Sequence, residues 1–254
     1  MPDRARKDEL AASLVEVRER ITRACSAAGR DPGSVALVAV TKTYPATDVV
    51  LLAELGVTDV GENKDQEAAA KAAAVAEAGA SVRWHFVGQL QRNKANSVAR
   101  YADVVESVGS LRLASALDAA AARHRDRPLD VLIQVSIDGD EARGGAVLTG
   151  VAGAAAPGAA APVDPERDLL RIADQVASAE MLRLRGLMAV APLGWEPARA
   201  FEALAATVAR LRAEHPEATV LSAGMSGDLE EAVAHGATHV RIGTSLLGMR
   251  NLLR

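Results

Sequence analysis

The chain has 254 residues, of which 49% are hydrophobic and 24% charged, and its net charge is −4. This balance is typical of a soluble globular protein, and the acidic charge argues against a nucleic-acid-binding or polybasic membrane-binding surface. Aromatic residues make up only 2% of the chain, so the core must be built from Ala, Val and Leu. The length is that of one (β/α)8 barrel.

Cysteine content and the N-terminal segment indicate the compartment. Cys25 is the single cysteine, which excludes an internal disulfide and fits a reducing environment. Residues 1–29 are charged and helical in pattern, unlike a signal peptide, and no apolar run approaches the length of a membrane span. These features predict a cytoplasmic protein. We also expect a monomer without nucleic-acid or membrane partners.

The hydrophobic pattern predicts one helix over 7–28 and then a regular alternation of strands and helices. The predicted strands cover 35–41, 58–60, 82–87, 103–106, 129–137, 184–190, 219–222 and 239–242. The predicted helices cover 48–55 with Thr47 as its cap, 65–78, 93–101, 110–124, a helix starting at Asp164-Pro165-Glu166, 196–214, 228–235 and a short closing helix. Eight such units predict a parallel, closed (β/α)8 TIM barrel with an extra N-terminal helix.

One stretch interrupts this alternation. Residues 144–165 are nearly all Gly, Ala, Val and Pro without a helical or strand period. We interpret them as a flexible surface insertion; the alternative is an Ala-rich helix broken by Pro157 and Pro162. No linker separates two domains, so we expect residues 1–254 to form a single domain.

Lys42 is the first candidate functional residue. It follows the apolar run of the strand at 35–41, and parallel α/β folds place their chemistry at the carboxyl ends of such strands. An amine there is expected to be partly desolvated, which lowers its pKa and favours the neutral form that a Schiff base requires. The alternative is a lysine that merely extends its charged end into solvent.

Two small-residue turns at the last two strand ends are typical of a phosphate site. Gly224-Met225-Ser226-Gly227-Asp228 opens one helix, and Arg241-Ile242-Gly243-Thr244-Ser245 precedes the next. Barrels commonly bind phosphate between the loops after strands seven and eight, with backbone N–H groups as donors. The alternative is that small residues simply permit tight turns.

Arg241 lies inside the last strand, where a guanidinium needs a partner. That partner is either the ring nitrogen of a ligand or a carboxylate such as Glu62, which with Asn63 ends the second strand within reach of Lys42. His85 is more typical of a hydrogen-bonded core residue than of a catalyst. The histidines show no metal-ligand spacing. An amine, phosphate donors and an arginine together suit pyridoxal 5′-phosphate.

The same residues resemble a known family. The matching segments are Val40-Thr41-Lys42-Thr43, Gly61-Glu62-Asn63, residues 84–94, Arg185-Gly186-Leu187-Met188, residues 221–228 and Arg241-Ile242-Gly243-Thr244. In family order, they resemble the pyridoxal phosphate homeostasis proteins, single-barrel relatives of the alanine racemase N-terminal domain.

The resemblance implies a site and a role. It implies a Schiff base between pyridoxal 5′-phosphate and Lys42, and no established catalytic turnover. It further implies that the protein buffers the cofactor or supplies it to pyridoxal-phosphate-requiring apo-enzymes. The other implied cofactor contacts are Ser226, Gly243 and Thr244 on the phosphate with Ser222 nearby, Arg241 at the pyridine nitrogen, and Asn63 at the cofactor's edge.

The chain departs from the family pattern at two positions. Tyr44 and Arg143 stand where relatives often carry lysine. The racemase relatives use a further β-domain, which we expect this chain to lack. The alternatives are a weak amino-acid racemase, a Schiff-base aldolase without cofactor, and a regulatory module whose partner surface includes residues 143–165.

Overall fold

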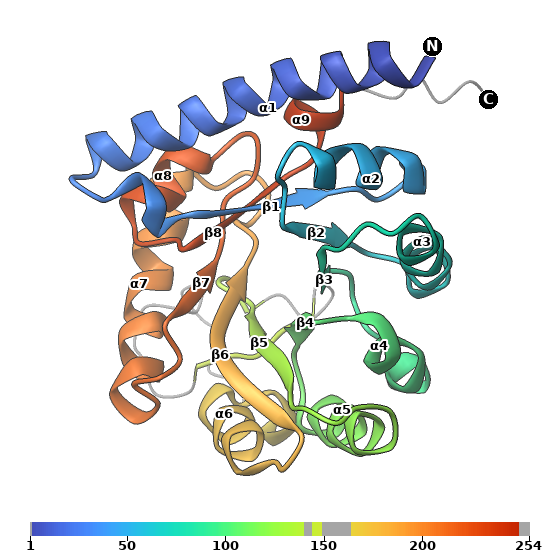
Figure 1. The fold of residues 1–254 in the computed structure, drawn as a ribbon. Coiled ribbons are helices and arrows are strands. Elements are labelled where there is room, and N and C mark those ends of the chain that lie inside the picture. The colour runs from blue at the N-terminus through green and yellow to red at the C-terminus, as the bar shows by residue number, and fades with distance from the viewer. Residues whose placement is uncertain (1, 140–143, 149–163, 249–254) are drawn as a thin grey trace.

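The computed structural model describes residues 2–139, 144–148 and 164–248. Predictions on Arg143 and on residues 149–163 lie outside the described residues. The strands of the described part form a closed barrel in chain order, and parallel pairing of β1 with β8 closes it (Figure 1). The strands are β1 Ala36–Val40, β2 Asp59–Glu62, β3 Arg83–Phe86, β4 Val104–Val108, β5 Leu129–Val135, β6 Leu182–Ala189, β7 Val220–Ser222 and β8 His239–Ile242. The predicted TIM barrel is therefore confirmed.

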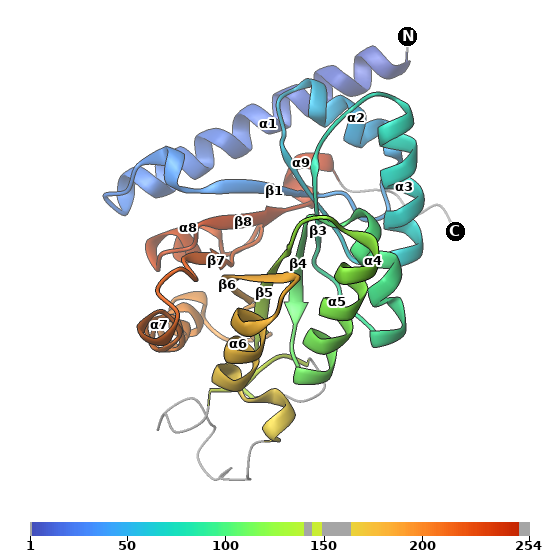
Figure 2. The same cartoon turned by 60° about the horizontal axis from the view of Figure 1, so that its bottom comes forward.

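Helices cover the outside of the barrel and alternate with the strands. They are α1 Pro2–Ala27, α2 Ala46–Glu54, α3 Asp65–Glu77, α4 Ala95–Tyr101, α5 Leu111–His124, α6 Leu169–Ser178, α7 Pro197–Glu214, α8 Leu229–Ala234 and α9 Thr244–Leu247. Helix α1 is the predicted extra helix. It packs across α8 and α9, which follow the last two strands (Figures 1 and 2). None of the described helices is long and apolar enough to cross a membrane.

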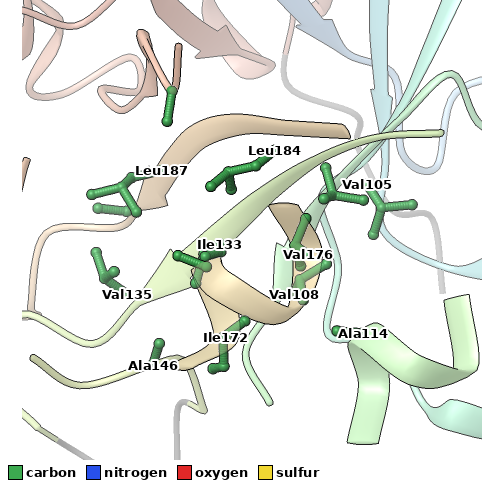
Figure 3. Packing of buried hydrophobic residues seen from close by; sticks show 14 of the residues in the cluster. Val105, Val108, Ala114, Ile133, Val135, Ala146, Ile172, Val176, Leu184 and Leu187 are labelled. Atoms are coloured by element: carbon green, nitrogen blue, oxygen red, sulfur yellow. The ribbon is translucent and has the colours of Figure 1, made fainter. Parts of the chain in front are cut away.

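The core consists of aliphatic side chains between the strands and the surrounding helices. Figure 3 shows one part of it, where Ile133 and Val135 of β5 lie near Ile172 and Val176 of α6. All four side chains are at most 6% exposed. The Ala-rich composition lets helices such as α5 lie close to the strands, which compensates for the scarcity of aromatic residues.

Two sequence predictions are wrong in detail. Pro45, and not Thr47, occupies the N-cap of α2, because the helix already begins at Ala46. Residues 144–148, the start of the predicted insertion, are ordered: Ala146 bridges to Val135 of β5 and is fully buried in the core of Figure 3. Backbone hydrogen bonds hold this segment, which a composition without periodicity does not reveal.

Candidate functional site

Lys42 lies at the carboxyl end of β1, next to the end of β8. Val38 and Ala39 pair with Arg241 and Ile242, and a Cβ added to Gly243 would lie 3.4 Å from the Val40 carbonyl oxygen. The Lys42 side chain is exposed, so the partial desolvation predicted from its position is wrong. The chain turns outward after the buried Thr41, because Thr43 adopts a positive φ of 70°.

Several polar groups at these strand ends have no partner within the described part of the chain. The amine of Lys42, the amide of Asn63 and the hydroxyls of Ser226 and Thr244 make no hydrogen bond or ion pair with any described residue. Lys42 and Thr244 are exposed, and Asn63 and Ser226 are partly buried. The loops that carry them follow β1, β2, β7 and β8, which adjoin one another in the barrel. These groups are therefore free to bind a ligand.

The turn after β7 is shaped by glycine and by a carboxylate. Gly224 has a φ of 92°, and a Cβ there would lie 2.5 Å from the Ala232 Cβ, so only glycine fits. Asp228 Oδ1 accepts a 2.6 Å hydrogen bond from the Met225 N–H. The backbone N–H of Arg241 donates to the Gly224 carbonyl at 2.9 Å, which connects this turn to β8. This bond holds the turn after β7 against the strand that leads into the second predicted phosphate turn.

Arg241 is buried at the ends of β6 and β7. Its Nη1 donates to the Ser222 carbonyl and hydroxyl at 2.7 and 2.8 Å, and its Nη2 donates to the Ala189 carbonyl at 2.8 Å. The nearby carboxylate is Glu106, with Oε2 3.8 Å from Nη1. The alternative in which Arg241 pairs with Glu62 is therefore wrong, since the nearby carboxylate is that of Glu106. The Ser222 hydroxyl donates to Glu106 Oε2 at 2.6 Å, so its single proton is used in a hydrogen bond inside the barrel.

His85 connects Glu106 to Asp59, which lies at the start of β2. Its Nδ1 lies 2.6 Å from Glu106 Oε1, and its Nε2 lies 2.9 Å from Asp59 Oδ1. Burial by itself would lower the pKa of His85, but the hydrogen bonds and charges of both carboxylates outweigh it and raise the pKa to about 9. The imidazole is therefore a charged, hydrogen-bonded core residue, in agreement with the sequence prediction. Two cations, His85 and Arg241, balance the two carboxylates.

A second buried cluster lies beside Lys42 and was missed by the sequence analysis. Lys71 Nζ of α3 donates to Glu62 Oε1 at 2.5 Å and to the Thr41 carbonyl at 2.8 Å, and its side chain is only 5% exposed. Burial raises the pKa of Glu62, although Lys71 and Thr41 oppose this effect. A signal was present: Lys71 shares a helical stripe with Ala68 and Val75, both buried. Glu62 therefore supports the strand end and does not pair with Lys42.

The chain is similar to known proteins along nearly its full length. A family model described as alanine racemase, N-terminal domain, matches residues 13–251. The pyridoxal phosphate homeostasis protein of Mycobacterium leprae is 45% identical, covering 97% of this chain and 95% of that protein. The PipY structure of Synechococcus elongatus PCC7942 with PLP bound is 33% identical with a TM-score of 0.75, covering 94% of this chain and all of that one.

A more distant structure shows the fold alone. Alanine racemase from Corynebacterium glutamicum is 16% identical with a TM-score of 0.63, and the alignment covers 97% of this chain but 62% of the racemase. The barrel and its strand-end site thus define a protein of the alanine racemase N-terminal domain class. Within that class, the chain belongs to the pyridoxal phosphate homeostasis protein family.

Proposed function

We propose that this protein binds pyridoxal 5′-phosphate at the carboxyl ends of its strands and holds it as a Schiff base on Lys42. The observation that carries the proposal is the set of polar groups there that have no partner among the described residues, in which the amine of Lys42 lies beside two hydroxyl-bearing turns. The name of the Mycobacterium leprae relative and the ligand of PipY support the same cofactor. Lys42 would supply the neutral amine that condenses with the cofactor's aldehyde, and the carbon–nitrogen double bond would form with release of water.

The residues of the strand ends divide the binding task. Ser226, Gly243 and Thr244 would hold the phosphate through hydroxyl and backbone N–H donors, as glycine allows a close approach of the backbone. Asn63 would contact the edge of the ring. Arg241 would face the ring nitrogen, and Ser222 would orient its guanidinium through the 2.8 Å hydrogen bond between them.

We further propose a role in cofactor buffering or supply rather than in turnover. Arg241 cannot release a proton to the ring nitrogen, which weakens the ring as an electron sink. The cofactor would then be stored on Lys42 and passed to pyridoxal-phosphate-requiring apo-enzymes in the cytoplasm. The runner-up function is a weak amino-acid racemase, since the barrel class is shared with alanine racemase.

The Lys42→Ala variant tests the proposed adduct. Wild-type protein mixed with pyridoxal 5′-phosphate should develop an absorbance band near the visible edge, and Lys42→Ala should lose it. Borohydride reduction followed by peptide mass mapping should place the pyridoxyl group on the peptide that contains residue 42. A matched control is Lys64→Ala, which removes another exposed lysine of a neighbouring strand-end loop. A pyridoxyl group only on Lys64 or Lys94 would refute the assignment.

Turnover is measured separately. With L-alanine or D-alanine as substrate, we expect no interconversion above the rate of free pyridoxal 5′-phosphate. Interconversion by the wild type that Lys42→Ala abolishes would favour the racemase function.

A further inference from the structure

The backbone on both sides of Lys42 is held by one helix. Lys71 Nζ donates to the Thr41 carbonyl at 2.8 Å, and Glu67 Oε1 accepts from the Thr43 N–H at 2.6 Å. Glu67 and Lys71 are four residues apart on α3, so both side chains lie on the same face, with 3.2 Å between Lys71 Nζ and Glu67 Oε1. Two residues of α3 therefore form hydrogen bonds with the peptide groups on both sides of Lys42.

Buried charges complete this cluster. The three acceptors of Lys71, namely the Thr41 carbonyl, Glu62 Oε1 and Glu67 Oε1, use all three protons of an ammonium group. An amine that donates three hydrogen bonds has no lone pair to attack an aldehyde, so Lys71 itself is not a candidate for the adduct. The Thr41 hydroxyl also donates to Glu62 Oε1, at 2.7 Å, which ties the same strand end from a second direction.

The gripped backbone is strained. Among the described non-glycine residues, Thr43 alone has a positive φ, which is 70°. A β-branched side chain disfavours that conformation. Strain of this kind persists only where surrounding contacts impose it. The bonds from Lys71 and Glu67 are such contacts, and they act on the residues next to the amine.

We propose that Glu62, Glu67 and Lys71 are positioning residues that fix the backbone of Lys42 and so present its amine to the cofactor. This inference rests on the proposed Schiff base at Lys42 and adds the reason why that lysine is selected. Lys64 and Lys94 are also exposed, but no described side chain grips the backbone on both sides of either. A free but fixed amine loses less conformational entropy on reaction than a mobile one.

Glu67→Ala is the variant that separates positioning from folding. Its side chain is 30% exposed, whereas Lys71→Met would leave Glu62 buried without its counter-charge and risks unfolding. Glu77→Ala is the matched control, because Glu77 is an exposed glutamate on the same helix. We expect Glu67→Ala to weaken pyridoxal 5′-phosphate binding about tenfold, the loss of one charge-assisted hydrogen bond, and Glu77→Ala to have no effect.

The same substitution in the Lys42→Ala background shows whether the effect passes through the amine. Non-covalent cofactor binding, measured by equilibrium dialysis, should be equal in Lys42→Ala and in the Lys42→Ala, Glu67→Ala double variant. Glu67→Gln, which keeps a carbonyl oxygen for the Thr43 N–H, should recover most of the affinity. Hydrogen exchange in the ligand-free full chain should be faster at residues 42–44 of Glu67→Ala and unchanged in Glu77→Ala.

The outcomes separate this inference from the proposed function. Equal weakening in both backgrounds, unchanged affinity of Glu67→Ala, or a Glu67→Gln variant as weak as Glu67→Ala would overturn the positioning role. A wild-type protein with no adduct on Lys42 would instead refute the proposed function. In that case, unchanged hydrogen exchange at residues 42–44 in Glu67→Ala would also refute the role of Glu67 in fixing the backbone next to Lys42.

Discussion

At the scale of single residues, the strand-end site depends on which charges are already paired. Arg241 and His85 face Glu106 inside the barrel, and Lys71 faces Glu62 beside it. Each of these buried cations has a buried carboxylate within 4 Å, as a low-dielectric interior requires. Lys42 differs because no described carboxylate pairs with it. Its amine is therefore available for chemistry, while the charges of Arg241, His85 and Lys71 are already balanced by buried carboxylates.

His85 makes stability depend on pH in a definite direction. Its pKa is about 9 in the folded protein, above the ordinary value of 6.5, so the folded state binds the proton more tightly. The stabilisation is fully present below pH 6.5 and is lost as the pH rises to about 9 and beyond. We expect the free energy of unfolding to fall by up to about 3 kcal/mol over that range.

Urea unfolding at a series of pH values from 6 to 10 checks this expectation. The imidazole signals of His85 in an NMR titration identify the group responsible. His239 is the internal comparison, because burial and the nearby charge of His85 lower the pKa of His239. A free energy of unfolding that stays constant while His85 loses its proton would contradict the prediction.

At the scale of elements, α1 braces the turn after β7. Arg20 Nη1 donates to the Ser226 carbonyl at 2.7 Å and its Nη2 donates to Glu230 Oε2 at 2.6 Å. Near the other end of the same helix, Arg6 donates to the Leu247 carbonyl of α9 at 3.0 Å. The extra helix therefore contacts both segments that carry the proposed phosphate donors, which explains its place across α8 and α9 in Figure 1.

Arg20→Ala should loosen that turn. We expect cofactor affinity to fall several-fold and stability by about 1 kcal/mol, since the side chain is partly exposed and its ion pair is screened by solvent. Arg23→Ala on the same helix is the control, because Arg23 pairs with Glu19 at 3.5 Å and is mostly exposed. Absorbance titration and thermal unfolding of both variants provide the measurements. Equal effects of the two substitutions would argue against a brace.

At the scale of the whole molecule, the polar groups of the proposed site lie at one end of a closed barrel, at the ends of β1, β2, β7 and β8. The interior below them is filled by the paired charges of Asp59, His85, Glu106 and Arg241. A ligand bound at the strand ends would contact loops from β1, β2, β7 and β8, which are far apart in sequence. Binding should therefore stabilise the folded state as a unit.

Cofactor addition should raise the melting temperature in a concentration-dependent way. At a free concentration 100 times the dissociation constant, mass action contributes about 2.7 kcal/mol. For a chain of this size that corresponds to a shift of roughly 5–10 °C. Differential scanning fluorimetry with pyridoxal 5′-phosphate measures the shift, and pyridoxine 5′-phosphate, which lacks the aldehyde, is the control ligand. A shift of equal size with both would mean that the Schiff base adds nothing to stability.

The amino-acid sequence alone determined the barrel, the extra helix and the positions of the proposed site residues. Strand and helix periods, and turns such as Gly224–Asp228, are properties of residues that are neighbours along the chain. The strand Val104–Val108 is apolar except for Ser107 and for Glu106, which is fully buried. A buried carboxylate of this kind must have a partner.

Only the tertiary structure decided which residues pair with Glu106 and with the other buried charges. Glu106 meets His85 and Ser222, Glu62 meets Lys71, and Arg241 meets Ser222 and Ala189, each across different strands or helices. It also exposed Lys42, for which strand-end position had predicted partial desolvation, and it buried Lys71 of α3, for which the sequence analysis made no prediction. The physical reason is that strand register and helix rotation set these contacts, and both depend on packing over the whole barrel.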